Sequence, residues 1–217
     1  TLVASPTSVV ANGSTTSSVT VRLADANGNL LSASGGTVAL SSTGSATVSA
    51  VTDNANGTYT ATVTNTVAES VTISGTLDGA AITDTATITF TVGAADPTNS
   101  NTTLVASPTS VVANGSTTSS VTVRLADANG NLLSASGGTV ALSSTGSATV
   151  SAVTDNANGT YTATVTNTVA ESVTISGTLD GAAITDTATI TFIDAKAPTL
   201  LSSCLLYTSP SPRDTIR

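Results

Sequence analysis

The amino-acid sequence predicts an all-β fold made of two tandem antiparallel β-sandwiches. Three observations support this prediction. Residues 1–90 recur letter for letter as residues 103–192, at an offset of 102 positions. Within each copy, apolar side chains alternate with hydroxyl side chains at a period of two, as in half-buried strands. Asn-Gly, Asp-Gly and Gly-Gly pairs, which supply the positive φ angles of tight turns, separate these runs.

The repeat sets the domain organisation. A period of 102 residues is too long for a solenoid unit and suits one small autonomous domain. The connecting residues are small, polar and include a proline, which is typical of a short and only partly stiff linker. We therefore expect a domain at 1–92, a linker at 93–102, an identical second domain at 103–194, the start of a further module at 195–203 and an unrelated tail at 204–217.

Each copy contains seven runs with strand character. In one of them Val19, Val21 and Leu23 share a face, while Thr20 and Arg22 share the other. Seven short strands with turns every 8–12 residues or so are typical of an immunoglobulin-like sandwich, and an unclosed barrel is the structural alternative. In chain order the predicted runs are 2–10, divided at Pro6 because proline cannot donate to a ladder, then 17–24, 37–41, 46–51, 58–64, 70–77 and 82–92.

The predicted core is thin. Tyr59 and Phe90 are the two aromatic residues of the first copy, and aliphatic side chains fill the rest. Tyr59 lies in the fifth run, whereas the tyrosine corner of immunoglobulin domains belongs to the sixth strand. We therefore expect Tyr59 to be an ordinary core tyrosine.

Four segments carry a family resemblance. Residues 19–29, 37–42, 53–64 and 68–75, in this order, resemble bacterial immunoglobulin-like domains of the invasin/intimin type. The resemblance covers both copies and implies extracellular repeats of a bacterial cell-surface adhesin, outer-membrane-anchored or secreted. It further implies no catalytic residues, neighbouring domains of the same chain as partners, and a host or cell-surface receptor bound through regions outside this sequence.

Composition excludes several classes of function. The chain has no His and one Cys, so Ser-His-Asp chemistry, an internal disulfide and a cysteine-based zinc site are excluded. A net charge of −8 with five Lys and Arg argues against nucleic-acid binding. No apolar run approaches the length of a membrane span. The only Lys is Lys196, so Lys–Asn isopeptide crosslinks within the repeats are excluded, and the absence of Gln excludes Thr–Gln esters and Cys–Gln thioesters.

Acidic residues at turns are the remaining candidates for a site. Residues 25–29 place oxygen ligands at alternate positions, like the start of an EF-hand, but Leu30 and Gly36 stand where that loop needs Gly and an acid. A calcium site using Asp25, Asp53 or Asp96 is left open beside ordinary turn chemistry. Asp53 with Asp84 as a glycosidase pair is weighed against solvated turn residues, which we favour. We predict no catalytic, metal or cofactor-binding residue.

The tail differs from both copies. Residues 204–214 resemble a translated sequencing-library adapter, because their reverse translation reproduces a transposon-derived adapter sequence, and residues 215–217 would cover a barcode. Such a scar is excluded from fold reasoning.

For function, we expect structural spacer repeats of a large adhesin, which project a distal binding domain from the cell surface. The alternatives are a glycan- or protein-binding module and an accessory region of a secreted enzyme.

Overall fold

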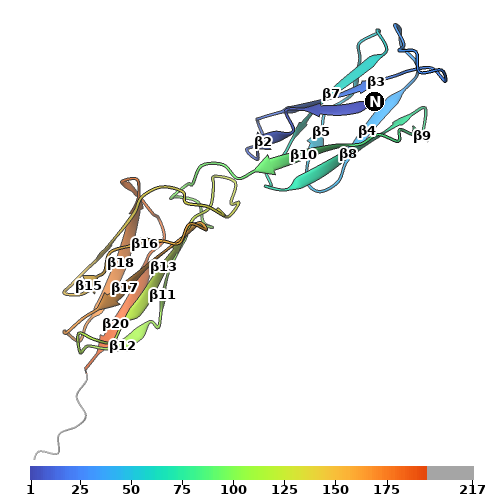
Figure 1. Cartoon of the computed structure of the whole chain (residues 1–217). Coiled ribbons are helices and arrows are strands. Elements are labelled where there is room, and N and C mark those ends of the chain that lie inside the picture. The colour runs from blue at the N-terminus through green and yellow to red at the C-terminus, as the bar shows by residue number, and fades with distance from the viewer. Residues whose placement is uncertain (195–217) are drawn as a thin grey trace, which may run out of the picture.

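The computed structural model describes residues 1–194 of the chain, so the predictions for residues 195–203 and for the tail lie outside the described residues. Every regular element in the described range is a strand, and the strands form two sandwiches joined by one connecting segment (Figure 1). The all-β fold with two tandem immunoglobulin-like sandwiches is confirmed. None of residues 1–194 lies in a helix that could cross a membrane.

The first sandwich contains the first half of the strands. Seven of its ten strands have three residues or more, and β5, β6 and β9 are two-residue bridges. In chain order they are β1 (Leu2–Ser5), β2 (Ser8–Val10), β3 (Ser17–Arg22), β4 (Val38–Ser42), β5 (Thr47–Val48), β6 (Thr52–Asp53), β7 (Thr58–Thr64), β8 (Ser70–Leu77), β9 (Ala80–Ala81) and β10 (Ala86–Thr91).

The second sandwich repeats this order with nearly the same bounds. Its strands are β11 (Thr103–Ser107), β12 (Ser110–Val112), β13 (Ser119–Arg124), β14 (Val140–Ser144), β15 (Thr149–Val150), β16 (Thr154–Asp155), β17 (Thr160–Thr166), β18 (Ser172–Leu179), β19 (Ala182–Ala183) and β20 (Ala188–Ile193).

Each sandwich consists of two sheets. In the first sandwich one sheet has the order β1-β3-β7-β5, with β6 also on β7, and the other has the order β2-β10-β8-β4, with β9 on β8. The pair β2–β10 is parallel, as is β12–β20, and the other ladders are antiparallel. With the first strand divided between the two sheets, this order corresponds to the immunoglobulin arrangement.

The period-two pattern places the core between the sheets. Along β10 the side chains of Ala86, Ile88 and Phe90 are 8%, 0% and 2% exposed, while the intervening threonines face solvent. The same alternation buries Val19 and Val21 of β3 in the facing sheet. Aliphatic burial of this kind stabilises each sandwich by about 25 cal/mol for each Å² of apolar surface removed from water.

Two details differ from the predicted runs, and a third agrees with them. The run 46–51 forms only the short strand β5, because its remaining residues make no ladder. The bridges β6 and β9 are absent from the predicted strands, since two residues are too few to show a period. Pro6 divides the first run as expected, and the residues on either side of it join different sheets.

Tyr59 of β7 and Gly57, just before β7, both contact the long segment between β3 and β4. The Tyr59 hydroxyl donates to Gly36 O at 2.8 Å and accepts from Gly35 N at 3.0 Å, and its ring is 2% exposed. Gly57 has a φ of +79°, and a Cβ at this position would collide with the carbonyl of Leu31. Tyr59 is thus a core tyrosine whose hydroxyl binds backbone far from it in sequence.

Candidate functional site: the junction between the repeats

The two ends of the chain in each sandwich lie at opposite ends of the sheets. At one end Thr1 N donates to Arg22 O at 2.8 Å, beside the end of β3. At the other end Ala11 N donates to Thr91 O at 2.8 Å, where β10 finishes. The second sandwich therefore continues from the far end of the first, and residues 93–102 connect them (Figure 1).

A loop of the second sandwich faces the first one at this junction. We call residues 126–131 the docking loop; they follow β13. The Asp127 carboxylate accepts the backbone N–H groups of Asn129 and Asn131 through Oδ1, both at 2.9 Å, and Gly130 N donates to Asp127 O at 2.9 Å. These bonds lie within the loop, so its conformation does not depend on contact with the first sandwich.

Two asparagines of the docking loop bind the backbone of the first sandwich directly. Asn131 Oδ1 accepts from Ala68 N at 2.9 Å, and Asn131 Nδ2 donates to Thr66 O at 2.9 Å. Asn129 Nδ2 donates to Ala11 O at 3.0 Å. Because a side-chain amide carries both a donor and an acceptor, Asn131 satisfies both backbone groups of one turn.

The connecting segment is bonded to the second sandwich near both of its ends. Asp96 N donates to Ala126 O at 2.8 Å, and Ala126 N donates to Thr102 Oγ1 at 3.0 Å. Thr102 Oγ1 in turn donates to Asp96 O at 2.7 Å, and Thr102 is 1% exposed. This closed set of bonds fixes the segment.

The middle of the segment is bonded as well. Asn99 Nδ2 donates to Ala128 O at 3.1 Å, and Asn101 Nδ2 donates to Gly130 O at 2.9 Å. Thr185 N donates to Pro97 O at 3.1 Å. The partly stiff linker expected from composition is thus held against the second sandwich along its length.

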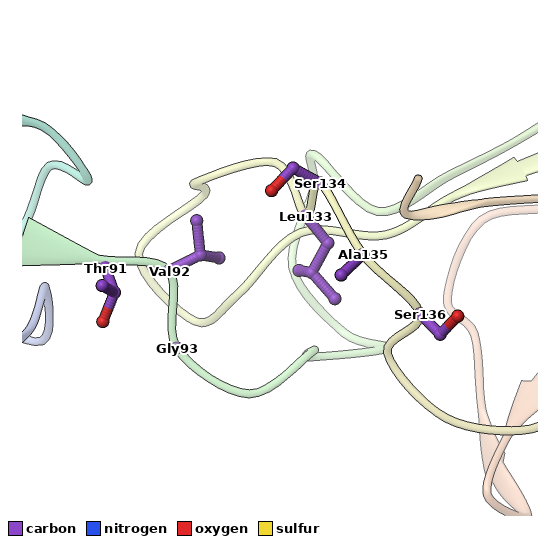
Figure 2. A pocket seen from close by; sticks show the side chains of 7 residues that line it. All are labelled: Thr91, Val92, Gly93, Leu133, Ser134, Ala135 and Ser136. Carbon is purple, nitrogen blue, oxygen red and sulfur yellow. The ribbon is translucent and has the colours of Figure 1, made fainter. Parts of the chain in front are cut away.

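Apolar contacts accompany these hydrogen bonds. Val92 and Ala95 pack against the core of the second sandwich, where Leu133 is 7% exposed. A hollow of about 320 Å³ lies here, lined by residues 91–93 and 133–136. Figure 2 shows Val92, which follows β10, and Leu133, from the segment between β13 and β14, among the side chains that line this hollow. The lining carries no charged side chain, so this hollow has no acid–base group.

Asp127 is the buried charge of the junction, with 1% of its surface exposed. Its Oδ2 accepts from Gly93 N at 2.9 Å and from Asn131 Nδ2 at 2.9 Å. Burial raises the pKa of Asp127, but hydrogen bonds from Asn131, Gly93 and Asn129 outweigh it and hold the pKa below its usual value. The carboxylate is therefore ionised at neutral pH, and backbone and amide donors compensate its burial.

The three aspartates weighed as calcium ligands are occupied by turn chemistry. The carboxylates of Asp25, Asp53 and Asp96 each accept the backbone N–H two residues further along, at 2.8–2.9 Å. In the described range 1–194, no three acidic groups gather where they could hold a metal ion. These hydrogen bonds give each aspartate a part in its turn that requires no metal ion.

The two aspartates weighed as a glycosidase pair lie on different elements. Asp53 belongs to β6, whereas Asp84 lies just before β10 and forms an ion pair with the N-terminal amine of Thr1 at 3.7 Å. Asp53 thus has a partner within its own turn and Asp84 has the amine of Thr1, and these contacts are in line with the solvated-turn interpretation.

Several residues of the junction carry no prediction from the sequence. From the sequence, Asn129, Asn131 and Thr102 are ordinary turn and linker residues, and the motif of the docking loop predicts a turn but no contact with another sandwich. The one available signal is apolar: Val92 and Ala95 interrupt an otherwise polar connection. Two sandwiches joined end to end through such a bonded connection define a tandem immunoglobulin-like repeat protein.

Comparison with known proteins identifies the family. The profile described as invasin, domain 3, matches residues 1–93 and again residues 96–195. The chain belongs to this family, and the resemblance to invasin/intimin-type domains is confirmed. None of the curated proteins matches the chain.

Solved structures of bacterial proteins, one of them described as an adhesin, are similar to it. The crystal structure of invasin, described as a bacterial integrin-binding protein, shares 28% identity over 89% of this chain and 40% of its own, with a TM-score of 0.60. InvD of Yersinia pseudotuberculosis shares 31% identity over 92% of this chain and 60% of its own, at 0.56. The Escherichia coli adhesin FdeC shares 26% identity over 90% of this chain and 63% of its own, with a TM-score of 0.62. The chain thus spans 40–63% of the length of these three proteins.

Proposed function

We propose that residues 1–194 are spacer repeats of an extracellular bacterial surface adhesin, which hold a distal binding domain away from the cell. The observation that carries this proposal is the end-to-end junction, where Asn129 and Asn131 bind the first sandwich and the linker is bonded to the second. A spacer needs length and fixed joints, and this junction provides the joint.

Each repeat adds its own length to such a stalk. The longest strands have eight residues, which corresponds to about 26 Å at roughly 3.3 Å per residue. Because the chain enters and leaves each sandwich at opposite ends, the lengths of successive repeats add instead of folding back. Two identical copies suit this role, since a spacer requires no unique site.

The ladder geometry supports resistance to pulling. The parallel pair β2–β10 joins the start of the domain to its last strand, with Ser8, Val9 and Val10 opposite Thr89, Phe90 and Thr91. A force on the two termini slides these strands past each other. Inter-strand hydrogen bonds run across the strands, so such a force loads the bonds of the ladder together and not one at a time.

Aromatic burial argues against a glycan-binding platform. Tyr59, Phe90, Tyr161 and Phe192 are each 2% exposed, so residues 1–194 present no open ring on which a sugar could stack. Among the related proteins described above, one is described as an integrin-binding protein and one as an adhesin, which supports a non-enzymatic role on the bacterial surface. Any receptor of the kind named for invasin is then bound outside these two repeats.

Small-angle scattering of the full chain tests the proposal. We expect one elongated particle whose maximum dimension matches two sandwiches in line. The matched control replaces residues 93–102 by a Gly/Ser segment of equal length and should broaden the distribution of dimensions. A native chain as broad as the control contradicts a spacer with fixed joints. Reproducible binding of the two-repeat chain to glycans or cells at micromolar concentration favours the binding module instead.

A further inference from the structure

The chain contains its own control, because identical sequences lie in different surroundings. Ala126 and Asp127 of the docking loop are 0% and 1% exposed. Their counterparts Ala24 and Asp25, with the same neighbours in sequence, are both exposed. The difference in burial marks the surface that the junction covers, and the first sandwich presents the same surface uncovered.

Apolar residues near this loop show the same difference. Leu133 and Ile184 are 7% and 3% exposed in the second sandwich, where Val92 and Ala95 pack against their core. The counterparts Leu31 and Ile82 are only partly buried. An apolar end of the first sandwich is therefore incompletely covered, and the second sandwich shows which groups cover it.

The uncovered loop already has the bound conformation. Asp25 Oδ1 accepts from Asn27 N and Asn29 N at 2.9 Å each, and Asn29 Nδ2 donates to Asp25 Oδ2 at 2.9 Å. The corresponding bonds of Asp127 have the same lengths. Because the loop is preformed, docking costs little conformational entropy there.

We propose that residues 24–29 of the first sandwich are a docking surface for the end of a further copy of the same repeat, attached through a linker like residues 91–102. Asn27 and Asn29 would bind the backbone of that copy as Asn129 and Asn131 bind Ala11, Thr66 and Ala68. The inference rests on the proposed spacer function, because it makes the junction a repeating unit.

The residues at the end of the second sandwich show that this end does not suit the docking surface of the first. The uncovered apolar surface needs a residue like Val92, which packs on the core of the following sandwich. At the corresponding position the second copy has Asp194, preceded by Ile193 in place of Thr91. A carboxylate is costly against an apolar core, so the C-terminal end of another molecule of this chain is a poor occupant.

The test adds one copy of residues 1–102 before Thr1 of the full chain. Amide hydrogen exchange is measured at Ala24, whose counterpart Ala126 donates to Thr102 Oγ1 at 3.0 Å. We expect exchange at Ala24 to slow by at least about tenfold on extension, a change equal to about 1.4 kcal/mol of local opening. Thr102→Val in the added copy removes the acceptor hydroxyl and should reverse the slowing. Ala68 of the added copy, whose counterpart donates to Asn131 Oδ1 at 2.9 Å, should exchange faster in the Asn29→Ala variant.

Each outcome decides a separate point. If Ala24 exchanges as fast in the extended chain while Ala126 is protected, the docking surface is refuted and the spacer function stands. If Ala126 is unprotected as well, the junction itself fails and with it the spacer function. Concentration-dependent self-association of the 217-residue chain in sedimentation would show that the occupant is a second molecule, contrary to the proposal.

Discussion

Replacing Asn131 by Ala measures the strength of the junction, with Asn29→Ala as its matched control. The Asn131 side chain makes two bonds to the first sandwich, with Ala68 N and Thr66 O, both at 2.9 Å. Its bond to Asp127 recurs in the other copy as the bond of Asn29 to Asp25, also at 2.9 Å. The difference between the two variants therefore isolates the two inter-repeat bonds.

The expected size follows from the number of bonds lost. A net contribution of about 0.5–1.5 kcal/mol per hydrogen bond gives about 1–3 kcal/mol for the pair. At about 2 kcal/mol, the ratio of docked to undocked junctions falls roughly 30-fold in Asn131→Ala. The control variant should leave that ratio unchanged, because Asn29 does not take part in the junction.

Amide exchange followed by nuclear magnetic resonance provides the assay. The Ala68 N–H donates to Asn131, whereas its counterpart Ala170 is exposed and serves as an internal reference. We expect Ala68 to exchange roughly 30-fold faster in Asn131→Ala, at the energy worked out above, and at the native rate in Asn29→Ala. Equal effects of the two variants on Ala68, or none from Asn131→Ala, would refute the assignment of these bonds as the joint.

Four further predictions concern stability. The pKa values of Asp127 and Glu171 lie below their usual range, the first because hydrogen bonds from Asn131 and backbone amides outweigh burial, the second through the Ser147 amide. Because the chain has no His, the free energy of unfolding should be level from about pH 5 to 7, and it should fall as the pH drops below about 4 toward the native pKa values. Urea unfolding at a series of pH values checks this. A loss of stability already at pH 6 contradicts it. Gly57→Ala should destabilise the first sandwich by more than the cost of about 1–2 kcal/mol for a left-handed residue, because the added Cβ meets the Leu31 carbonyl. Gly28 also has a positive φ, +85°, but open space around it, so Gly28→Ala should cost only the backbone strain. Equal Tm shifts for the two variants would count against the close contact. Tyr59→Phe leaves the Gly35 N–H and the Gly36 carbonyl without the hydroxyl and should cost about 1–3 kcal/mol in denaturant unfolding, and an unchanged midpoint would mean that water replaces it. Millimolar calcium should leave Tm unchanged, because Asp25, Asp53 and Asp96 are engaged in turns, and a calcium-dependent rise would revive the metal site left open by the sequence.

Local pattern was sufficient for most of the fold. The alternation along residues 58–64 and 70–77 predicts β7 and β8 at their observed bounds, because a period-two pattern is written in consecutive residues. Pro6 predicts the division of the first strand for a similarly local reason. The bridges β6 and β9 have two residues each and depend on what lies opposite them, so no pattern announces them.

The junction shows the limit of local pattern. The Asp-Ala-Asn-Gly-Asn motif predicts a turn in both copies, and both copies form the same turn with the same bonds. Whether the asparagine amides face solvent or a neighbouring sandwich depends on residues about 60–120 positions away, such as Ala11 and Thr66 for the second copy. The local interpretation as a turn is therefore correct, but the contacts of its asparagine amides are set at long range.

The sequence by itself therefore determined the repeat, the longer strands and their buried faces, because the period-two alternation is written in consecutive residues, and it determined the family through four ordered segments. Only the tertiary structure decided which copy of each surface is covered. Asp25 and Asp127 occupy equivalent positions in turns of identical sequence, yet Asp25 is exposed, whereas Asp127 is 1% exposed and accepts a hydrogen bond from Gly93. The physical reason is that burial and hydrogen-bond partners belong to the neighbours of a residue in space, which two identical stretches of sequence need not share.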